Sequence, residues 1–264
     1  MFKWFTARRR DRIVRRHPIA DALWHDVVSA TPVLAALDQS ELRRLREMAT
    51  VFVAEKSFVG THELVVTDYM RVAVAAQACL LILNLGLGYY RDWYTVVLYP
   101  TAFVASRETE DEDGVVHTGY EELDGESMTG GPMALSWEEV DPRTASPEGN
   151  VVLHECAHKL DELTGDPNGL PPLHMDMRVS NWSAAFTAAF AHFDAAVASA
   201  DELEFDDYAA TDASEFFAVM TESFFSTPQR LREEYPAVYE QLARFFRQDP
   251  ARRLSRSAPV PPTH

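Results

Sequence analysis

The feature that most constrains this chain of 264 residues is a short histidine motif, His154-Glu155-x-x-His158. On a helix, residues four apart lie one above the other on the same face, so the two imidazoles can bind one metal ion. The glutamate beside the first histidine can then act on water bound to that metal. The motif therefore predicts a helix that carries a catalytic metal.

The residues around the motif are typical of a helix. Ser146 followed by Pro147 predicts an N-cap with proline at the first helical position, and Gly165 offers a C-terminal end. Gly149 and Asn150 are poor helix formers and weaken this predicted start. Apolar residues recur at helical spacing and predict a buried stripe beside the histidine face: Leu153, Cys156, Ala157, Leu160 and Leu163. The alternative, an accidental match with two half-buried histidines in a core helix, is disfavoured by this context.

Composition excludes some classes of function. The chain has 24 basic and 41 acidic residues, a net charge of −17, which disfavours direct nucleic-acid binding by the molecule as a whole. An apolar content of 47% is sufficient for a folded core. Two cysteines, Cys79 and Cys156, do not make a disulfide framework. Because no secretory leader is recognised either, we expect a cytoplasmic, reducing location.

The two ends of the chain differ from the rest. Residues 1–16 contain seven basic residues and one acid, with no apolar segment typical of a signal peptide after them. We predict a basic flexible leader over 1–17, with docking to a membrane surface as an alternative. Residues 249–264 lack the apolar content to fold, which predicts a flexible tail rich in proline and arginine.

Residues 18–248 are predicted to form a single domain of the α+β class. Hydrophobic periodicity favours helices over 18–90, and the motif helix with further helices occupies 146–248. The apolar segment 72–87 falls short of the roughly 20 residues that span a bilayer, so we expect a buried helix and no transmembrane segment. Residues 91–140 are strand-rich. The predicted fold is thus mostly helical, with a small sheet packed beside the motif helix.

The predicted strands lie at 94–100, 102–105, 114–120 and 133–137. The last of these precedes the motif helix, and as an edge strand it would bind a peptide by strand addition. Residues 108–139 contain eleven acids and no lysine or arginine. This acidic stretch is either a solvated rim or a surface that attracts a cationic partner.

A catalytic zinc usually takes a third protein ligand. The three-histidine class requires glycine and histidine where this chain has Asp161 and Thr164, so it is excluded. A later helix offers Glu215 and Glu222, which are seven apart and therefore share a face. Glu215 could instead close a capping box with Asp212, and Glu222 would then be the candidate ligand.

Other polar residues near the motif allow two interpretations. Asp161 and Glu162 either orient a ligand histidine from behind or lie on an exposed helix face. His117 and His174 have no partner at metal-ligand spacing, so we expect structural roles for both.

Two segments of the chain, 154–161 and 208–219, resemble the Mlc titration factor A family, and the shorter stretches 99–100 and 246–250 are similar to it as well. The likeness covers most of residues 20–250, whereas the basic leader and the tail have no match in the family pattern. The resemblance implies a bacterial cytosolic zinc metallopeptidase of gluzincin type. Its fold would be similar to the catalytic domain of anthrax lethal factor.

The resemblance also implies roles for individual residues. His154, His158 and Glu215 would be the Zn²⁺ ligands, Glu155 the general base, and Tyr208 the contact to the transition-state oxyanion. Tyr208 could instead be an aromatic residue at a packing interface with its hydroxyl in water.

The implied function is aminopeptidase-like hydrolysis of a peptide substrate. The namesake of the family binds Mlc, a transcriptional repressor of glucose uptake, so a Mlc-like repressor is an expected partner. The rival hypothesis is a non-catalytic binding protein that sequesters a transcriptional regulator, with zinc serving structure alone.

Overall fold

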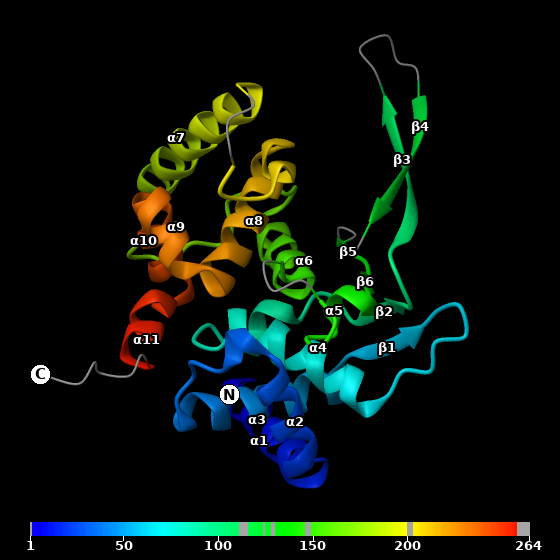
Figure 1. Ribbon diagram of the computed structural model, residues 1–264. Coiled ribbons are helices and arrows are strands. Elements are labelled where there is room, and N and C mark those ends of the chain that lie inside the picture. Colours follow the sequence, from blue (N-terminus) through cyan, green and yellow to red (C-terminus); the bar gives the residue numbers. More distant parts are fainter. Residues whose placement is uncertain are drawn as a thin grey trace, which may run out of the picture.

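The structure, a computed structural model, describes residues 2–110, 116–123, 125–127, 130–145, 149–199 and 203–257 (Figure 1). The helices are α1 (Phe2–Arg16), α2 (Asp21–Ala30), α3 (Gln39–Glu55), α4 (Asp68–Leu81), α5 (Trp137–Val140), α6 (Val151–Asp161), α7 (Val179–Ala198), α8 (Ala213–Ser226), α9 (Pro228–Glu234), α10 (Pro236–Phe246) and α11 (Pro250–Ser257). The strands are β1 (Ser57–Gly60), β2 (Thr95–Tyr99), β3 (Phe103–Glu110), β4 (Val116–Leu123), β5 (Gly125–Ser127) and β6 (Met133–Ser136). The predicted α+β class, mostly helical with a small sheet, is confirmed.

Single turns of 3₁₀ helix connect several of these elements, and local chemistry explains many of the helix starts. The turns are η1 (Pro32–Leu34), η2 (Leu87–Tyr90), η3 (Glu162–Thr164) and η4 (Asp207–Ala210). Asp38 caps α3 in a capping box with Glu41, and Thr67 caps α4. Pro228 and Pro236 stand at the first position of α9 and α10, where a missing N–H costs nothing.

The sheet has the strand order β1-β2-β6-β5, with β1, β2 and β6 parallel and β5 antiparallel to β6. The edge-strand prediction for 133–137 is wrong, because β6 lies between β2 and β5 and all four of its residues are buried. The edge belongs to β5, a strand of three residues too short for the sequence pattern to show. β1 likewise lies within the segment predicted to be entirely helical.

A second antiparallel pair, β3 and β4, forms a ribbon in register from Phe103 opposite Leu123 to Glu110 opposite Val116. Figure 1 shows this ribbon projecting away from the helices. It contains most of the predicted strands 102–105 and 114–120, and β3 and β4 continue beyond them to Glu110 and Leu123. Part of the acidic stretch 108–139, including 111–115, lies outside the described residues, so neither reading of that stretch is decided.

The core is built around α4, in which every residue from Val72 to Leu81 is buried. The prediction of a buried helix over 72–87 is therefore confirmed for residues 72–81, and the helix ends at Leu81. α4 packs against α2, α3 and α6, and the predicted stripe on α6 faces it, with Leu153, Cys156 and Leu160 fully buried. In Figure 1, α6 lies between the sheet and α8, and this position brings the motif next to both.

Both ends of the chain are helical where the structure describes them, and their flexibility stays a prediction. The basic leader forms α1, which packs against α3. The tail continues as α11, where Ala251 is fully buried and Arg253 forms an ion pair of 2.8 Å with Glu41. Both short segments gain their order from tertiary contacts that composition does not reveal. Residues 258–264 lie outside the described part. Among the helices that the structure describes, none has both the length and the apolar character needed to cross a membrane.

Candidate metal centre

The motif helix α6 starts later than the sequence predicts. Its N-cap is Asn150, whose side-chain oxygen accepts a hydrogen bond of 3.0 Å from the backbone N–H of Leu153. The prediction of a start at Ser146 and Pro147 is wrong, since the helix begins at Val151 and residues 146–148 are outside the described part. Asn150, which seemed to weaken the helix, is the residue that caps it.

The two histidines of the motif face each other on one side of α6. The Nε2 atoms of His154 and His158 are 3.3 Å apart, and the ring centroids are separated by 5.0 Å. This arrangement follows from the spacing of four residues on a helix, as the sequence predicts.

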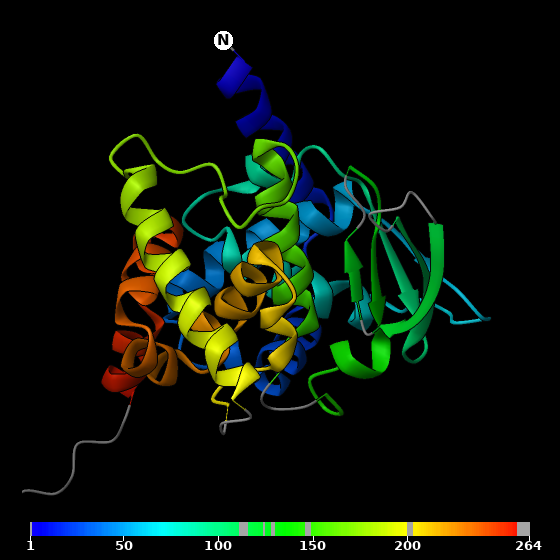
Figure 2. The same cartoon turned by 90° about the horizontal axis from the view of Figure 1, so that it is seen from above.

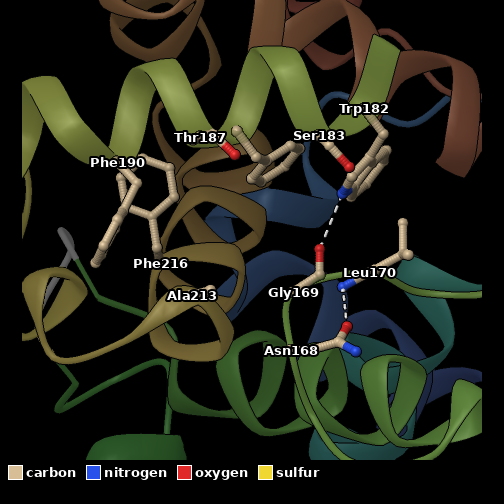
Figure 3. A pocket seen from close by; sticks show the side chains of 10 residues that line it. Asn168, Gly169, Leu170, Trp182, Ser183, Thr187, Phe190, Ala213 and Phe216 are labelled. Atoms are coloured by element: carbon tan, nitrogen blue, oxygen red, sulfur yellow. Dashed lines mark hydrogen bonds between the residues drawn. The ribbon is translucent and has the colours of Figure 1, made fainter. Parts of the chain in front are cut away.

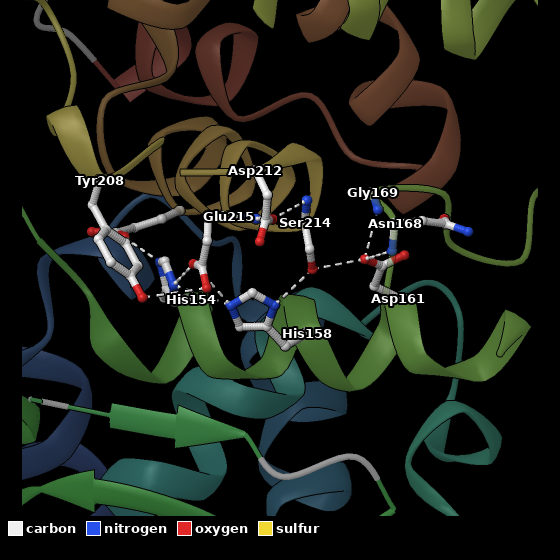
Figure 4. Close-up of polar contacts among 10 residues, drawn as sticks. His154, His158, Asp161, Asn168, Gly169, Tyr208, Asp212, Ser214 and Glu215 are labelled. Atoms are coloured by element: carbon white, nitrogen blue, oxygen red, sulfur yellow. Dashed lines mark hydrogen bonds and ion pairs between the residues drawn. The ribbon is translucent and has the colours of Figure 1, made fainter. Parts of the chain in front are cut away.

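Glu215, on α8, joins the two histidines. Its Oε2 atom lies 3.1 Å from Nε2 of His154 and 3.2 Å from Nε2 of His158 (Figure 4). The competing capping-box interpretation is wrong. Asp212 does cap α8, but it accepts from the backbone N–H of Glu215 at 2.9 Å, and the Glu215 side chain points to the histidines. His154, His158 and Glu215 are thus brought together as one group able to hold a metal ion.

The spacing of these three donor atoms fits a tetrahedral zinc ion. Bonds of about 2.0–2.1 Å in that geometry would separate the donors by roughly 3.3–3.4 Å. The observed separations of 3.1, 3.2 and 3.3 Å are close to this value. Two imidazole nitrogens and one carboxylate oxygen are also a ligand set of catalytic zinc sites, which leave one position for water.

The charges of the group are strongly coupled. Burial lowers the pKa of His154, but hydrogen bonds to Glu215 and Glu222 outweigh burial and raise that pKa to about 10. Burial raises the pKa of Glu215, but hydrogen bonds from His154 and His158 hold it well below its usual range. Without a metal, a proton on His154 therefore balances the carboxylates. A divalent cation would take over that role and displace the proton.

A chain of hydrogen bonds orients His158 from behind. Its Nδ1 atom is 3.1 Å from the hydroxyl of Ser214, which lies 2.9 Å from Oδ2 of Asp161 (Figure 4). A carboxylate only accepts, so the hydroxyl donates to Asp161 and accepts from Nδ1–H of His158. A neutral ring held in this way keeps its proton on Nδ1, so Nε2 is the nitrogen that could bind a metal ion. Of the two readings of Asp161, orientation of a ligand histidine is the one supported, and it operates through Ser214.

Asp161 itself is fixed by the loop after α6. Its carboxylate accepts backbone N–H groups of Asn168, Gly169 and Leu170 at 2.9, 2.7 and 2.9 Å. Gly169 has φ +76°, and a Cβ atom there would lie 2.5 Å from the carbonyl oxygen of Ala213. On its other side, the loop lines an aromatic pocket of about 140 Å³ (Figure 3). There the indole N–H of Trp182 donates to the carbonyl of Gly169 at 2.9 Å.

Glu222 contacts the Nδ1 atom of His154, as Ser214 contacts the Nδ1 atom of His158. Its Oε2 atom lies 3.4 Å from Nδ1 of His154, and its Oε1 atom accepts the backbone N–H of Asn150 at 2.6 Å. One carboxylate therefore orients the first histidine and also secures the start of α6. The sequence offered Glu222 only as a substitute ligand, so this role was missed.

Glu155 is buried on the side of α6 that faces the sheet. Its side-chain Oε2 atom is enclosed and has no hydrogen-bond partner within the described part of the chain. Burial raises the pKa of this carboxyl, against the positive charge of the two histidines. Gly125 of β5 lies against it, and a Cβ at that position would be 2.6 Å from Oε1 of Glu155. The Glu155 carboxylate is therefore a buried polar group without a protein partner, next to residues that could hold a metal ion.

Tyr208, on η4, reaches the same group from the opposite side. Its hydroxyl donates to Oε1 of Glu215 at 3.5 Å, and its ring centroid is 6.3 Å from that of His154.

The remaining candidate residues do not contact this group in the described contacts. Glu162 contacts Lys159 at 3.2 Å rather than a histidine. His174 hydrogen-bonds the carbonyl of Phe245 at 2.8 Å, a structural role as expected, and the side chain of His117 is outside the described part.

Sequence reasoning missed Ser214, Gly125 and the role of Glu222. Ser214 directly precedes Glu215, the candidate metal ligand, and a hydroxyl there is a signal that could have been read. Gly125 carries no comparable signal, because its importance comes from the approach of another element.

The fold and the site together define a class. A motif helix beside a small sheet supplies two histidines and an acid, and a later helix supplies a carboxylate, as in metallopeptidases whose third ligand is a distant glutamate. The model of one family, the glucose-regulated metallo-peptidase M90 family, matches residues 5–247. The chain belongs to this family.

Individual relatives agree with this assignment. The chain is 36% identical over 236 residues to the Mlc titration factor A of Edwardsiella ictaluri, covering 88% of this chain and 90% of the relative. It is 34% identical over 238 residues to the Mlc titration factor A of Yersinia pestis, and equally to that of Yersinia pseudotuberculosis. Each of these two alignments covers 89% of this chain and 87% of the relative.

Proposed function

We propose that the protein is a zinc-dependent peptidase with aminopeptidase-like activity. The observation that carries the proposal is the meeting of three donor atoms, from His154, His158 and Glu215, within 3.3 Å of one another. The buried carboxylate of Glu155 follows the first histidine directly. Family membership supports a metallopeptidase, and the donor set supports zinc.

In this proposal His154, His158 and Glu215 hold Zn²⁺, which when bound acidifies water and polarises the scissile carbonyl. Glu155 accepts the proton of the attacking water and then delivers it to the leaving amine. Its enclosed position and raised pKa suit a group that must both take and return a proton near neutral pH. The hydroxyl of Tyr208, which lies at the Glu215 carboxylate, donates to the oxygen that gains negative charge.

The substrate in this proposal is a peptide in extended conformation. β5 is the last strand of the sheet in the described part of the chain, and Gly125 within it lies against Glu155. A peptide that adds to this edge would place its backbone next to the proposed base. The absence of a side chain at Gly125 keeps that approach open. β5 thus takes the place that the sequence assigned to residues 133–137.

The experiment is a peptide-library digest combined with metal analysis of purified protein. We expect Glu155→Gln to keep zinc and lose hydrolysis, and Glu215→Ala to lose zinc. Glu240→Gln, the same change at an exposed position of α10, serves as the control and keeps both. Retained turnover in Glu155→Gln would reject this residue as the base, and full zinc occupancy in Glu215→Ala would reject it as a ligand.

We also propose that the partner is a Mlc-like transcriptional repressor, met in the cytoplasm. The support is the name of the relatives, Mlc titration factor A, together with two buried, unpaired cysteines. Chelation separates this role from catalysis. Loss of peptide cleavage with partner binding intact means that the two roles are independent. If the zinc-loaded protein cleaves no peptide and still binds the repressor, the non-catalytic binding protein is the correct reading.

A further inference from the structure

The charge of the molecule is divided unevenly between α1 and the rest. Residues 1–16 hold seven of the 24 basic residues (Lys3, Arg8, Arg9, Arg10, Arg12, Arg15 and Arg16) and a single acid, Asp11, so their net charge is +6. Since the whole chain has a net charge of −17, the remaining residues carry −17 − 6 = −23. A helix this basic on an acidic protein requires an explanation that the peptidase proposal does not give.

The helix also extends beyond its support. Arg9 on α1 forms an ion pair of 3.3 Å with Glu55, the last residue of α3. Asp21, which follows α1 in the chain, forms an ion pair of 2.6 Å with Arg46, nine residues before Glu55 on α3. α1 therefore runs antiparallel to α3, and residues 2–8 continue past its end, about 10 Å at 1.5 Å per residue. Figure 2 shows this end of α1 projecting from the body of the molecule.

Exposed arginines line one face of α1. Arg8, Arg12, Arg15 and Arg16 follow the spacing i, i+4, i+7 and i+8, which places them on the same side of the helix, and all four are exposed. Ile13 and Val14 are half-buried. The apolar residues are therefore partly covered, while the arginine face is exposed to solvent.

We propose that α1 is a docking helix for an anionic lipid surface. Each arginine close to such a surface raises partitioning by about fivefold, so four of them give roughly several hundredfold. The first turns of the helix contain Trp4 and Phe5, residue types that insert at the boundary between headgroups and acyl chains. Repulsion from the acidic body is screened over about 8 Å at physiological salt, a distance that the projecting turns exceed.

Two other polyanions fit the geometry less well. A nucleic-acid duplex bound along the arginine face would run beside a body with a net charge of −23, which opposes binding. The acidic body of a second copy would make a head-to-tail contact, which builds open chains unless it closes into a ring. A lipid surface contacts the exposed arginine face of α1 together with its projecting end, and it needs no second copy of the chain.

The test is co-sedimentation of the full chain with vesicles. We expect binding to phosphatidylcholine vesicles that contain phosphatidylglycerol, none to pure phosphatidylcholine, and release by high salt. Arg12→Gln combined with Arg16→Gln should lower the partition coefficient about 25-fold. The matched control, Arg178→Gln with Arg232→Gln, removes the same charge from exposed sites on other elements and should change it little.

Three outcomes overturn the proposal: equal loss of binding in both double variants, equal binding to the two kinds of vesicle, and no binding to either. Tight, salt-sensitive binding of a DNA duplex without vesicle binding would assign the helix to nucleic acid. Association that rises with protein concentration and disappears in Arg12→Gln with Arg16→Gln would assign it to a second copy. Circular dichroism of each variant checks that the loss does not come from unfolding.

Discussion

Replacing Ser214 by alanine tests whether the hydrogen-bond chain behind His158 prepares the metal site. Ser214 is buried, and its hydroxyl is the link between Nδ1 of His158 and the carboxylate of Asp161, at 3.1 and 2.9 Å. Asp161 would keep its three backbone donors in the variant, so His158 is the residue that is left without a hydrogen-bond partner at Nδ1. We expect the Ser214→Ala protein to fold and to bind zinc more weakly.

The size of the effect follows from what the histidine loses. A buried N–H left without an acceptor costs about 1–3 kcal/mol, and the ring is then free to adopt the tautomer that carries its proton on Nε2. Zinc binding then has to move the proton of His158 from Nε2 back to Nδ1, which lowers the affinity for zinc. Removing an outer partner of a ligand histidine typically lowers metal affinity by about 10–100-fold, or roughly 1.4–2.7 kcal/mol, which agrees with the loss of one buried hydrogen bond.

The assay is a competition titration of metal-free protein against a chromogenic zinc chelator. Ser226→Ala is the matched control, because Ser226 is on the same helix and its hydroxyl is buried without a partner among the described residues. Ser214→Thr keeps a hydroxyl and should restore most of the affinity. If Ser214→Ala binds zinc as tightly as the Ser226→Ala control, the hydrogen-bond chain does not prepare the site and the reasoning is refuted.

Three further predictions concern the same site. Tyr208→Phe should lower kcat by roughly a hundredfold with KM unchanged, as measured by steady-state kinetics, because only the transition state gains the hydrogen bond. Gly125→Ala places a Cβ atom 2.6 Å from Oε1 of Glu155, so turnover should fall by about tenfold or more while zinc analysis shows normal content. In the metal-free protein, the raised pKa of His154 contributes stability that is complete below about pH 6.5 and is lost as the pH rises toward 10. The lowered pKa of Glu215 contributes stability above its ordinary value of 4.5 that is lost as the pH falls further. The Tm of chelator-treated protein should therefore drop between pH 6.5 and 10, and the gain in Tm on adding zinc should widen over the same range. A gain that is constant with pH would contradict the coupling between proton and metal.

The motif helix and the core were predictable because local spacing determines them. The separation of four residues sets the faces of His154 and His158, and the apolar run in α4 can only be buried. The helix start was not predictable in the same way. Asn150 caps the helix with its side chain, and Glu222, 72 residues later, accepts its backbone N–H in a contact that exists only in the folded chain.

The order of the strands in the sheet could not be predicted from the sequence, because it also depends on contacts that form only in the folded chain. β6 looks in the sequence like any short apolar strand, and its central position depends on pairing with β2 and β5. The partner β5 spans three residues and includes a glycine and a glutamate, types that strands disfavour. The close approach to Glu155 explains the glycine, so what looks like a weak strand is a requirement of the site.

The spacing of the two glutamates of α8 limits the candidate third ligand to Glu215 or Glu222, but it does not decide between them. Glu215 and Glu222 are seven residues apart, two helical turns, and both reach His154, but at different nitrogens. Glu215 lies at Nε2, where His158 also points, whereas Glu222 lies at Nδ1, on the far side of the ring. A carboxylate at Nδ1 keeps the proton there and so leaves Nε2 free for a metal, which makes the second glutamate a condition for the first to act as a ligand. The sequence presents the two as alternatives. Because α8 packs across α6, the two glutamates contact different nitrogens of the same imidazole, and each therefore has a different role.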